Sequence, residues 1–477
     1  MMGGRKSNAA GRLFWPFWVI DAMGKFGIEF GKVVAVAFQE KCVVLRSSRA
    51  KCVQQFVIWL LLAMATAQAA LAAPNFTPQR RVGYTTGDQW EPALAADGHG
   101  HIYILFPQYG AVRDCRVCSI PTMALLVSND NGVSWEAPHP IVPSSSGQFD
   151  PQIVVDPVDR QTVYASWLQN NKRDVMVARS QDFGRSWYLT RAEHSPEDAD
   201  KPVLAVHGAD VYVGFNHEEN FQVAASHDYA QTFASTLVNP DAGAGSSLAG
   251  GATIDPTGAV YFSWTSYGRE SSNRPVSLYV SQSTDGGRNW NTVLLDASGA
   301  PPDCSAASCE TGYLGAQVAL ASDAAGTLYA LWSAGTSNGG PERMYFSSST
   351  SGGASWSGKV DVSSAGALAE HCFPALTAGV GGDVRIAWMD TRNHALPNQP
   401  MWNVFQRSSS NGGATWSAEA QLSGPARGYD YILPEGFRFP FGDYFSMAID
   451  NLGTTHVVWG EGRNYKSPGS IWYTRGR

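Results

Sequence analysis

One octapeptide pattern, S-x-D-x-G-x-S/T-W, returns six times along this chain and constrains its fold more than any other feature. Its copies are SNDNGVSW from Ser128, SQDFGRSW from Ser180, SHDYAQTF from Ser226, STDGGRNW from Ser283, STSGGASW from Ser349 and SSNGGATW from Ser409. The third copy lacks the Gly and the Trp, and the last two carry Ser351 and Asn411 in place of the Asp. A pattern this specific, recurring every 46 to 66 residues, indicates a repeat architecture.

The residue types of the octapeptide indicate a tight turn rather than a reactive site. An Asp such as Asp130 can accept backbone N–H groups within the turn. The Gly, as in Gly132, suits a backbone position with positive φ. The closing Trp, as in Trp135, is a large apolar group that can pack between neighbouring sheets. We therefore expect the octapeptide to stabilise a hairpin without taking part in chemistry.

A second pattern occurs seven times: an apolar strand, a turn rich in Asp and Gly, and a strand that ends in an aromatic residue. Its copies begin at Pro92, Pro151, Pro202, Ala252, Val318, Pro374 and Met447. Each copy reads as two β-strands joined by a tight turn. The octapeptide would then join a third strand to a fourth, which gives four-stranded units of about 50 residues.

Four-stranded units that recur along the chain predict an all-β fold, most simply a β-propeller of seven blades. The last unit supplies only three strands and ends at Ile471-Trp472-Tyr473-Thr474. The segment RRVGYT, residues 80–85, precedes the first unit and can serve as the outer strand of blade seven, which would close the ring and cover a free sheet edge. A six-bladed ring, with the degenerate unit around Ser226 absorbed differently, is the alternative.

The first 73 residues are expected to lie outside the propeller, which would occupy residues 74–477 as a single domain. The apolar run FVIWLLLAMA from Phe56 follows basic residues and precedes Ala70-Leu71-Ala72, as in a secretory signal peptide. Residues 1–45 are long for such a segment, which suggests a start codon placed too early; a transit or cytoplasmic segment is the weaker alternative. We therefore expect a secreted or periplasmic protein without a membrane anchor, most simply a monomer.

The charge of the chain limits the classes of binding partner, and its cysteines indicate disulfides or a metal site. The formal net charge is −7, and residues 74–477 are more acidic still, because nine Lys and Arg but only three Asp and Glu lie before them. An acidic surface argues against nucleic acid and anionic membranes as partners. After export, the pairs Cys115/Cys118 and Cys304/Cys309 would form local disulfides, with Cys372 left over. A metal site that joins a Cys pair to His371 and Cys372 is the sharper alternative, but its spacing matches no zinc module.

The expected topology separates two faces of the ring. Octapeptide turns and the short turns of the second pattern share one face, and the longer loops share the other. Polar residues on the longer loops precede an innermost strand or follow a second strand. They include Trp90-Glu91, Asp150, Asp200-Lys201, His371, Asp443-Tyr444, Asp390-Thr391-Arg392 and Glu461-Gly462-Arg463, with Tyr429, Glu435 and Arg438 on a long link. A rim of carboxylates, arginines and aromatics suits a polyhydroxylated ligand such as a sugar. For any single residue among them, an ion pair or a loop cap is the more ordinary role.

The octapeptide resembles the Asp-box, or bacterial neuraminidase repeat, of sialidases. WMDTRN from Trp388, GDYFSMAID from Gly442, and HVVWGEGR from His456 with IWYTR from Ile471 are similar to segments of secreted bacterial sialidase-like proteins. The resemblance spans roughly residues 80–477 and implies the propeller fold. Asp-boxes also occur in propellers that hydrolyse other glycans and in some without catalysis.

The resemblance implies a set of catalytic roles. Sialidases clamp the substrate carboxylate with three arginines, use a Tyr paired with a Glu as nucleophile, and use an Asp as acid and base. Position and context match Tyr444 to the nucleophile and Arg392 to a clamp arginine. By location alone, Arg463 and Arg438 complete the clamp, Glu435 or Glu461 assists Tyr444, and Asp150 or Asp114 acts as acid and base. The first clamp arginine of the family belongs to an R-I-P motif, where this chain has Pro92-Ala93-Leu94.

The resemblance therefore implies a glycoside hydrolase of the exo-α-sialidase type that acts on a sialoglycoconjugate or another glycan, without a cofactor or metal. Two other functions stay open. One is a non-catalytic propeller that binds carbohydrate or protein with the same face. The other is a lyase or hydrolase of a different acidic polysaccharide.

Overall fold

The structure is a computed structural model, and it describes residues 75–217, 220–239, 247–267, 275–302, 315–393, 401–427, 442, 444–462 and 469–477. The chain divides into two compact units, Met1–Leu71 and Ala72–Arg477. The expected signal peptide lies outside the described residues and stays a prediction. The regular structure of the described residues is entirely β-strand, and none of these residues belongs to a helix that could cross a membrane.

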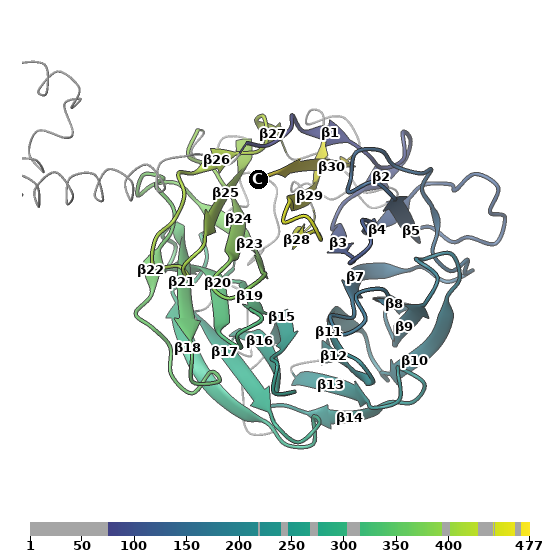
Figure 1. Cartoon of the computed structure of the whole chain (residues 1–477), viewed down its shortest axis with the longest axis horizontal. Coiled ribbons are helices and arrows are strands. Elements are labelled where there is room, and N and C mark those ends of the chain that lie inside the picture. Colours follow the sequence, from purple (N-terminus) through teal and green to yellow (C-terminus); the bar gives the residue numbers. More distant parts are fainter. Residues whose placement is uncertain are drawn as a thin grey trace, which may run out of the picture. The chain divides into compact units, whose positions relative to one another are not determined.

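Seven four-stranded sheets follow one another around a ring, which confirms the seven-bladed propeller (Figure 1). Blade 1 contains β3 (Ala93–Ala96), β4 (Ile102–Tyr109), β5 (Thr122–Ser128) and β6 (His139–Pro140), with the short β2 (Asp88–Gln89) added to β4. Blade 2 contains β7 (Phe149–Val155), β8 (Val163–Gln169), β9 (Asp174–Ser180) and β10 (Tyr188–His194). Blade 3 contains β11 (Ala199–His207), β12 (Asp210–His217), β13 (Asn220–Ser226) and β14 (Ala234–Leu237). Blade 4 contains β15 (Ser247–Ile254), β16 (Val260–Tyr267), β17 (Val276–Ser283) and β18 (Asn291–Ser298).

The remaining three blades complete the ring. Blade 5 contains β19 (Val318–Ser322), β20 (Leu328–Gly335), β21 (Glu342–Ser349) and β22 (Val360–Asp361). Blade 6 contains β23 (His371–Ala378), β24 (Val384–Asp390), β25 (Met401–Ser409) and β26 (Ala420–Gln421). Blade 7 contains β28 (Ser446–Ile449), β29 (Thr455–Gly462), β30 (Gly469–Gly476) and, from the other end of the domain, β1 (Arg80–Arg81). The short β27 (Ala426–Arg427) pairs with both β25 and β29 and so joins the sheets of blades 6 and 7.

The ring closes as the sequence predicts. Strand β1 lies antiparallel to β30, with Arg80 opposite Tyr473 and Arg81 opposite Trp472. The segment before the first repeat therefore supplies the outer strand of blade 7. This pairing covers the edge of β30 that would otherwise be open.

Large aromatic side chains fill the spaces between blades. The second strands of blades 2, 4, 5, 6 and 7 each contain a fully buried Trp two or three residues before the last residue of the strand, namely Trp167, Trp264, Trp332, Trp388 and Trp459. Burying an aromatic side chain of this size is among the largest single stabilising contributions in a core. The repeated aromatic near the end of each second strand is therefore the residue that holds neighbouring sheets together.

The octapeptides are tight turns between third and fourth strands, as expected. In the first copy, Ser134 N and Ser128 Oγ each donate a hydrogen bond of 2.8 Å to Asp130 Oδ1, and Gly132 has a φ of 76°. The degenerate third copy keeps this geometry with Ala230 at a φ of 64° in place of the Gly. Its turn hydrogen bonds offset the cost of a left-handed Ala.

Hydrogen bonds between turns confirm the two faces. Asn131, in the first octapeptide, donates to Asp450 Oδ2 and Asn451 Oδ1, which belong to the turn between β28 and β29. On the other face, the loop after β8 meets the loop before β11, where Ala199 N donates to Lys172 O at 2.9 Å. The longer loops thus gather opposite the octapeptides.

Candidate functional site

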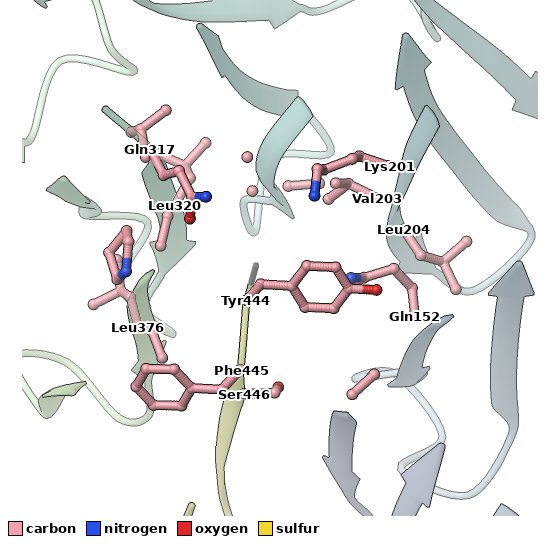
Figure 2. A pocket seen from close by; sticks show the side chains of 18 of the residues that line it. Gln152, Lys201, Val203, Leu204, Gln317, Leu320, Leu376, Tyr444, Phe445 and Ser446 are labelled. Atoms are coloured by element: carbon pink, nitrogen blue, oxygen red, sulfur yellow. The ribbon is translucent and has the colours of Figure 1, made fainter. Parts of the chain in front are cut away.

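A cavity of about 240 Å³ lies on the axis of the propeller and is lined by the innermost strands of all seven blades. Most of its lining residues are apolar, such as Leu204, Leu320 and Leu376, but polar atoms make up about half of its wall. Its polar side chains come from different blades: Gln152, Lys201, Thr265, Gln317, Tyr444 and Ser446. Figure 2 shows Tyr444, Lys201, Gln152 and Gln317 around the same space. A concave site where polar groups from several elements converge on apolar surface is typical of ligand binding.

A bulge in the innermost strands places side chains at one mouth of this cavity. In blades 2 and 3 the pairing slips between Phe149 and Gln152 and between Asp200 and Val203. The extra residues are the dipeptides Asp150-Pro151 and Lys201-Pro202, in which Asp150 and Lys201 have φ values of 54° and 47°. A left-handed residue other than Gly costs roughly 1–2 kcal/mol, so the surrounding structure must hold these residues in place.

The same position can be counted in every blade, six residues before the turn that joins the first two strands. It is occupied around the ring by Glu91, Asp150, Lys201, Ala249, Gln317, Phe373 and Tyr444. Glu91 and Phe373 share the left-handed conformation, with φ values of 51° and 53°. Ionisable or hydroxyl-bearing residues therefore fall on blades 7, 1, 2 and 3, and uncharged residues fall on blades 4 to 6.

Tyr444 is the predicted catalytic residue that lines the cavity. Its hydroxyl donates a hydrogen bond of 3.4 Å to Pro151 O, so it lies beside the Asp150-Pro151 peptide of blade 2. The Lys201 ammonium lies 5.3 Å from the centre of the Tyr444 ring. Glu91 is close to the same segment, because a Cβ on Gly442 would come within 2.2 Å of Glu91 Cγ. Tyr444 is therefore surrounded by residues of blades 1, 2 and 3.

Asp150 directly precedes Pro151, whose carbonyl accepts the Tyr444 hydrogen bond; it does not line the axial cavity and forms part of an ion-pair network. Lys172 Nζ is 3.5 Å from Asp150 Oδ2 and 3.4 Å from Asp200 Oδ1. Only 9% of the Asp150 side chain is exposed. One ammonium from the loop after β8 thus links two carboxylates that precede innermost strands.

Arg392, the predicted clamp residue of blade 6, has other partners. Its guanidinium donates to Asp390 Oδ2 at 2.7 Å and to Glu419 Oε2 at 2.5 Å, and it lies 3.6 Å from the centre of the Phe405 ring. Burial opposes its charge, but the hydrogen bonds to the two carboxylates raise the pKa of Arg392 above its ordinary value. Arg392 does not belong to the lining of the axial cavity.

The other catalytic residues implied by the resemblance do not line the axial cavity in the part of the chain that the structure describes. Arg438, Glu435 and Arg463 lie outside the described residues. Glu461 is buried in blade 7, where it accepts a hydrogen bond of 2.7 Å from Trp459 Nε1 and contacts Gln79 Nε2. Asp114 is 92% exposed on the loop after β4, with Arg113 as its ion-pair partner at 3.8 Å.

The cysteines follow the disulfide expectation where they are described. Cys115 and Cys118 form a disulfide, whereas Cys304 and Cys309 lie outside the described residues. Cys372 is buried and free. The His371 ring is hydrogen-bonded within the protein: Nδ1 donates to Glu342 O at 2.8 Å, and Nε2 lies 2.7 Å from Ser363 Oγ. Burial lowers the pKa of His371 to about 4. Within the described ranges no cluster of three or more His, Cys, Asp or Glu is arranged to hold a metal ion.

Two cavity residues, Gln152 and Gln317, were not singled out from the sequence. Each is a lone amide beside an otherwise apolar inner strand, in PQIVV and QVALA. Counting back from the Asp of the following turn would have identified Gln317 by its equivalence to Tyr444. Lys201 was recognised as one of several rim residues, but nothing in its local pattern distinguished it from the others.

Comparisons with known proteins found distant structural similarities. No protein-family model and no curated protein sequence matches this chain. Among solved structures, the Hadza microbial sialidase Hz136 is 15% identical, with a TM-score of 0.43 over 82% of this chain and 66% of that one. A protein of unknown function from Dyadobacter fermentans is 13% identical, with a TM-score of 0.48 over 85% of this chain and all of that one. An ulvan lyase of polysaccharide lyase family PL25 is 12% identical, with a TM-score of 0.47 over 82% and 95% of the two chains.

This chain spans slightly less than two thirds of the length of the Hadza sialidase. Similarities this low leave the chemistry to be argued from the residues of the site. The structural neighbours of the chain include sialidases and a polysaccharide lyase, all at low sequence identity.

Proposed function

We propose that this propeller acts on glycans as a glycoside hydrolase of the exo-α-sialidase type, with a terminal sugar held in the axial cavity beside Tyr444. The observation that carries the proposal is that Tyr444 lines the cavity with its hydroxyl 3.4 Å from Pro151 O, the carbonyl oxygen of the residue after Asp150. A phenol and a carboxylate from facing blades are the two groups that such a hydrolysis requires.

The size and lining of the cavity support a sugar ligand. Its volume of about 240 Å³ is below the roughly 300–1,000 Å³ of pockets for drug-sized molecules, so it suits a single ring. Gln152 and Gln317 provide amide donors and acceptors for hydroxyl groups, and Leu320 and Leu376 provide apolar surface. In the proposed reaction, the Tyr444 phenolate attacks the anomeric carbon while the glycosidic bond breaks and Asp150 protonates the leaving oxygen. Water then gives a proton to Asp150, attacks the anomeric carbon and releases Tyr444.

Fluorogenic sialoside hydrolysis tests this proposal. The Tyr444→Phe and Asp150→Asn variants are each expected to lose about 100-fold or more in kcat/KM. Tyr188→Phe is the matched control, because Tyr188 is 54% exposed on the outer strand β10. Turnover that survives Tyr444→Phe would exclude Tyr444 as the nucleophile.

A non-catalytic glycan-binding propeller is the second candidate, and the position of Arg392 favours it. The guanidinium expected to clamp a substrate carboxylate is bound instead to Asp390 and Glu419. An absence of turnover on sialosides, uronic-acid glycosides and neutral glycosides, together with glycan binding that Tyr444→Ala abolishes, would select this candidate.

The proposal also includes export, which N-terminal sequencing of the secreted protein would test.

A further inference from the structure

The axial cavity has a single charged side chain among its described lining residues, and that side chain is the lysine Lys201. The protein as a whole is acidic, with a net charge of −7, so a cation in the cavity runs against the average composition. An ammonium on the wall of a recessed cavity interacts most strongly with an anionic group, because charge attraction is stronger there than in bulk water.

We infer that Lys201 is the residue by which the cavity recognises an anionic substituent, a carboxylate or a sulfate, on the bound sugar. This inference rests on the proposed function and adds the class of substrate and the residue that selects it. It assigns anion recognition to a lysine of blade 3, on an innermost strand, rather than to the arginine of blade 6.

The backbone at Lys201 supports this role. Lys201 precedes Pro202 and has a φ of 47°, within a bulge where the pairing of β11 with β12 slips. Residues held in this region of conformational space cost free energy and concentrate at ligand sites. The equivalent residues of blades 4 to 6 are Ala249, Gln317 and Phe373, none of which carries a charge. A ligand would therefore meet positive charge from one side of the ring.

The two carboxylates at the start of the innermost strands of blades 2 and 3 form ion pairs with Lys172. Asp200, adjacent to Lys201 in sequence, lies 3.4 Å from Lys172 Nζ, and Asp150 lies 3.5 Å from the same atom. Lys172 therefore offsets the negative charge of both carboxylates at the rim. Lys201 itself lies over the Tyr444 ring, 5.3 Å from its centre. An anionic group held by Lys201 would consequently lie beside the proposed nucleophile.

The alternative anion reader, Arg392, is engaged elsewhere. Its two carboxylate partners, Asp390 and Glu419, have side chains that are 0% and 10% exposed. A ligand carboxylate would have to displace these charged hydrogen bonds, which are among the strongest in proteins.

Binding measurements on the full chain test the inference by calorimetry or by ligand-observed NMR. The probes are three methyl glycosides: the α-glycoside of N-acetylneuraminic acid, the β-glycoside of glucuronic acid, and the neutral β-glucoside. A fourth probe, galactose 6-sulfate, separates sulfate from carboxylate recognition. We expect the wild-type protein to bind at least one anionic probe about 10-fold or more tightly than the neutral one, with a preference that weakens as salt screens the charge.

Variants at Lys201 decide whether this side chain causes the preference. Lys201→Gln is expected to bind anionic and neutral probes equally, and Lys201→Arg to retain a preference. Lys359→Gln is the matched control, because it also removes one ammonium. Lys359 lies away from the cavity lining and pairs at 2.7 Å with Asp296 of the outer strand β18. Thermal unfolding of each variant verifies that the propeller remains folded.

The outcomes separate the inference from the proposed function. An anion preference that persists in folded Lys201→Gln, or equal binding of neutral and anionic probes by the wild type, overturns the inference and leaves a glycan-binding cavity. Failure of the wild type to bind or hydrolyse any of these glycans, together with hydrolysis assays that show no turnover, overturns the proposed function. Loss of the preference only in Lys201→Gln supports the inference, and turnover of a sialoside by the wild type supports the proposed function.

Discussion

Arg80 and Tyr473 pair across the seam of the propeller, one near each end of the domain. Their backbones are register partners in β1 and β30, and the Arg80 guanidinium lies 5.4 Å from the centre of the Tyr473 ring. The same guanidinium donates to Val133 O at 2.8 Å and to Gly132 O in the first octapeptide. A single side chain therefore connects the outer strand of blade 7 with the adjoining turn of blade 1.

Removal of this side chain should loosen the seam. We expect Arg80→Ala to lower the free energy of unfolding by about 1–2 kcal/mol, because two charge-assisted hydrogen bonds and one cation–π contact are lost. Urea unfolding followed by tryptophan fluorescence measures the effect. Arg113→Ala is the control, since Arg113 is 94% exposed and pairs only with the equally exposed Asp114 among the ion pairs of the described residues. Equal stabilities of the two variants would contradict the assignment.

The octapeptide turns should tolerate Ser better than Ala at the Asp position. Asp182 Oδ1 accepts hydrogen bonds from Ser186 N and Ser180 Oγ, both at 2.8 Å. In the fifth octapeptide, Ser351 Oγ accepts the equivalent bond from Ser355 N at 2.9 Å. We expect Asp182→Ala to cost about 1 kcal/mol and Asp182→Ser to cost less, as measured by thermal unfolding. An Asp182→Ser variant no more stable than Asp182→Ala would show that the backbone bond is unimportant.

The fold was largely predictable because its signals are local and repeated. Turn residues such as Asp130 and Gly132 define each hairpin by themselves, and their spacing fixes the blade size. Even the ring closure followed from a count of strands, since the seventh unit lacked an outer strand and residues 80–85 had no other unit to join.

The site was less predictable because it depends on contacts between distant residues. Tyr444 and Asp150 are 294 positions apart, and only the closed ring brings Tyr444 within 3.4 Å of Pro151. The bulges that orient Asp150 and Lys201 have no strong sequence signature, because a residue before Pro ordinarily adopts an extended conformation. Arg392 matched the family position, yet its ion pairs with Asp390 and Glu419 are visible only in three dimensions.

Glu461 should make stability depend on pH near neutrality. Burial raises the pKa of Glu461 from 4.5 to about 7, against the hydrogen bonds from Trp459 and Gln79. A carboxyl whose pKa is raised on folding contributes stability that is present below its unfolded pKa and is lost as the pH rises through the folded pKa. The Glu461 contribution should therefore disappear between about pH 4.5 and pH 8, by up to about 3 kcal/mol.

The Glu461→Gln variant isolates this effect. Blade 2 shows that Gln fits the position, because Gln169 accepts a hydrogen bond of 3.2 Å from Trp167 Nε1 just as Glu461 does from Trp459. We expect the stability of Glu461→Gln to exceed that of the wild type at pH 8 and the difference to shrink towards pH 5, as followed by urea unfolding at each pH. Parallel pH profiles for the two proteins would show that Glu461 does not titrate in this range.

Variants of Arg392 distinguish a structural role of this side chain from a role in substrate binding. If its function is to neutralise Asp390 and Glu419, Arg392→Ala should lower the free energy of unfolding by about 3 kcal/mol, because it leaves a fully buried carboxylate without its cation. Arg392→Lys keeps the charge but loses the forked hydrogen bonds, so its free energy of unfolding should lie between those of the wild type and Arg392→Ala. Glycan binding, measured at a temperature where all three proteins are folded, should stay within about twofold, well below one 1.4 kcal/mol decade of affinity. A stable Arg392→Ala that no longer binds an anionic sugar would instead make Arg392 the clamp, and anion recognition would then move from blade 3 to blade 6.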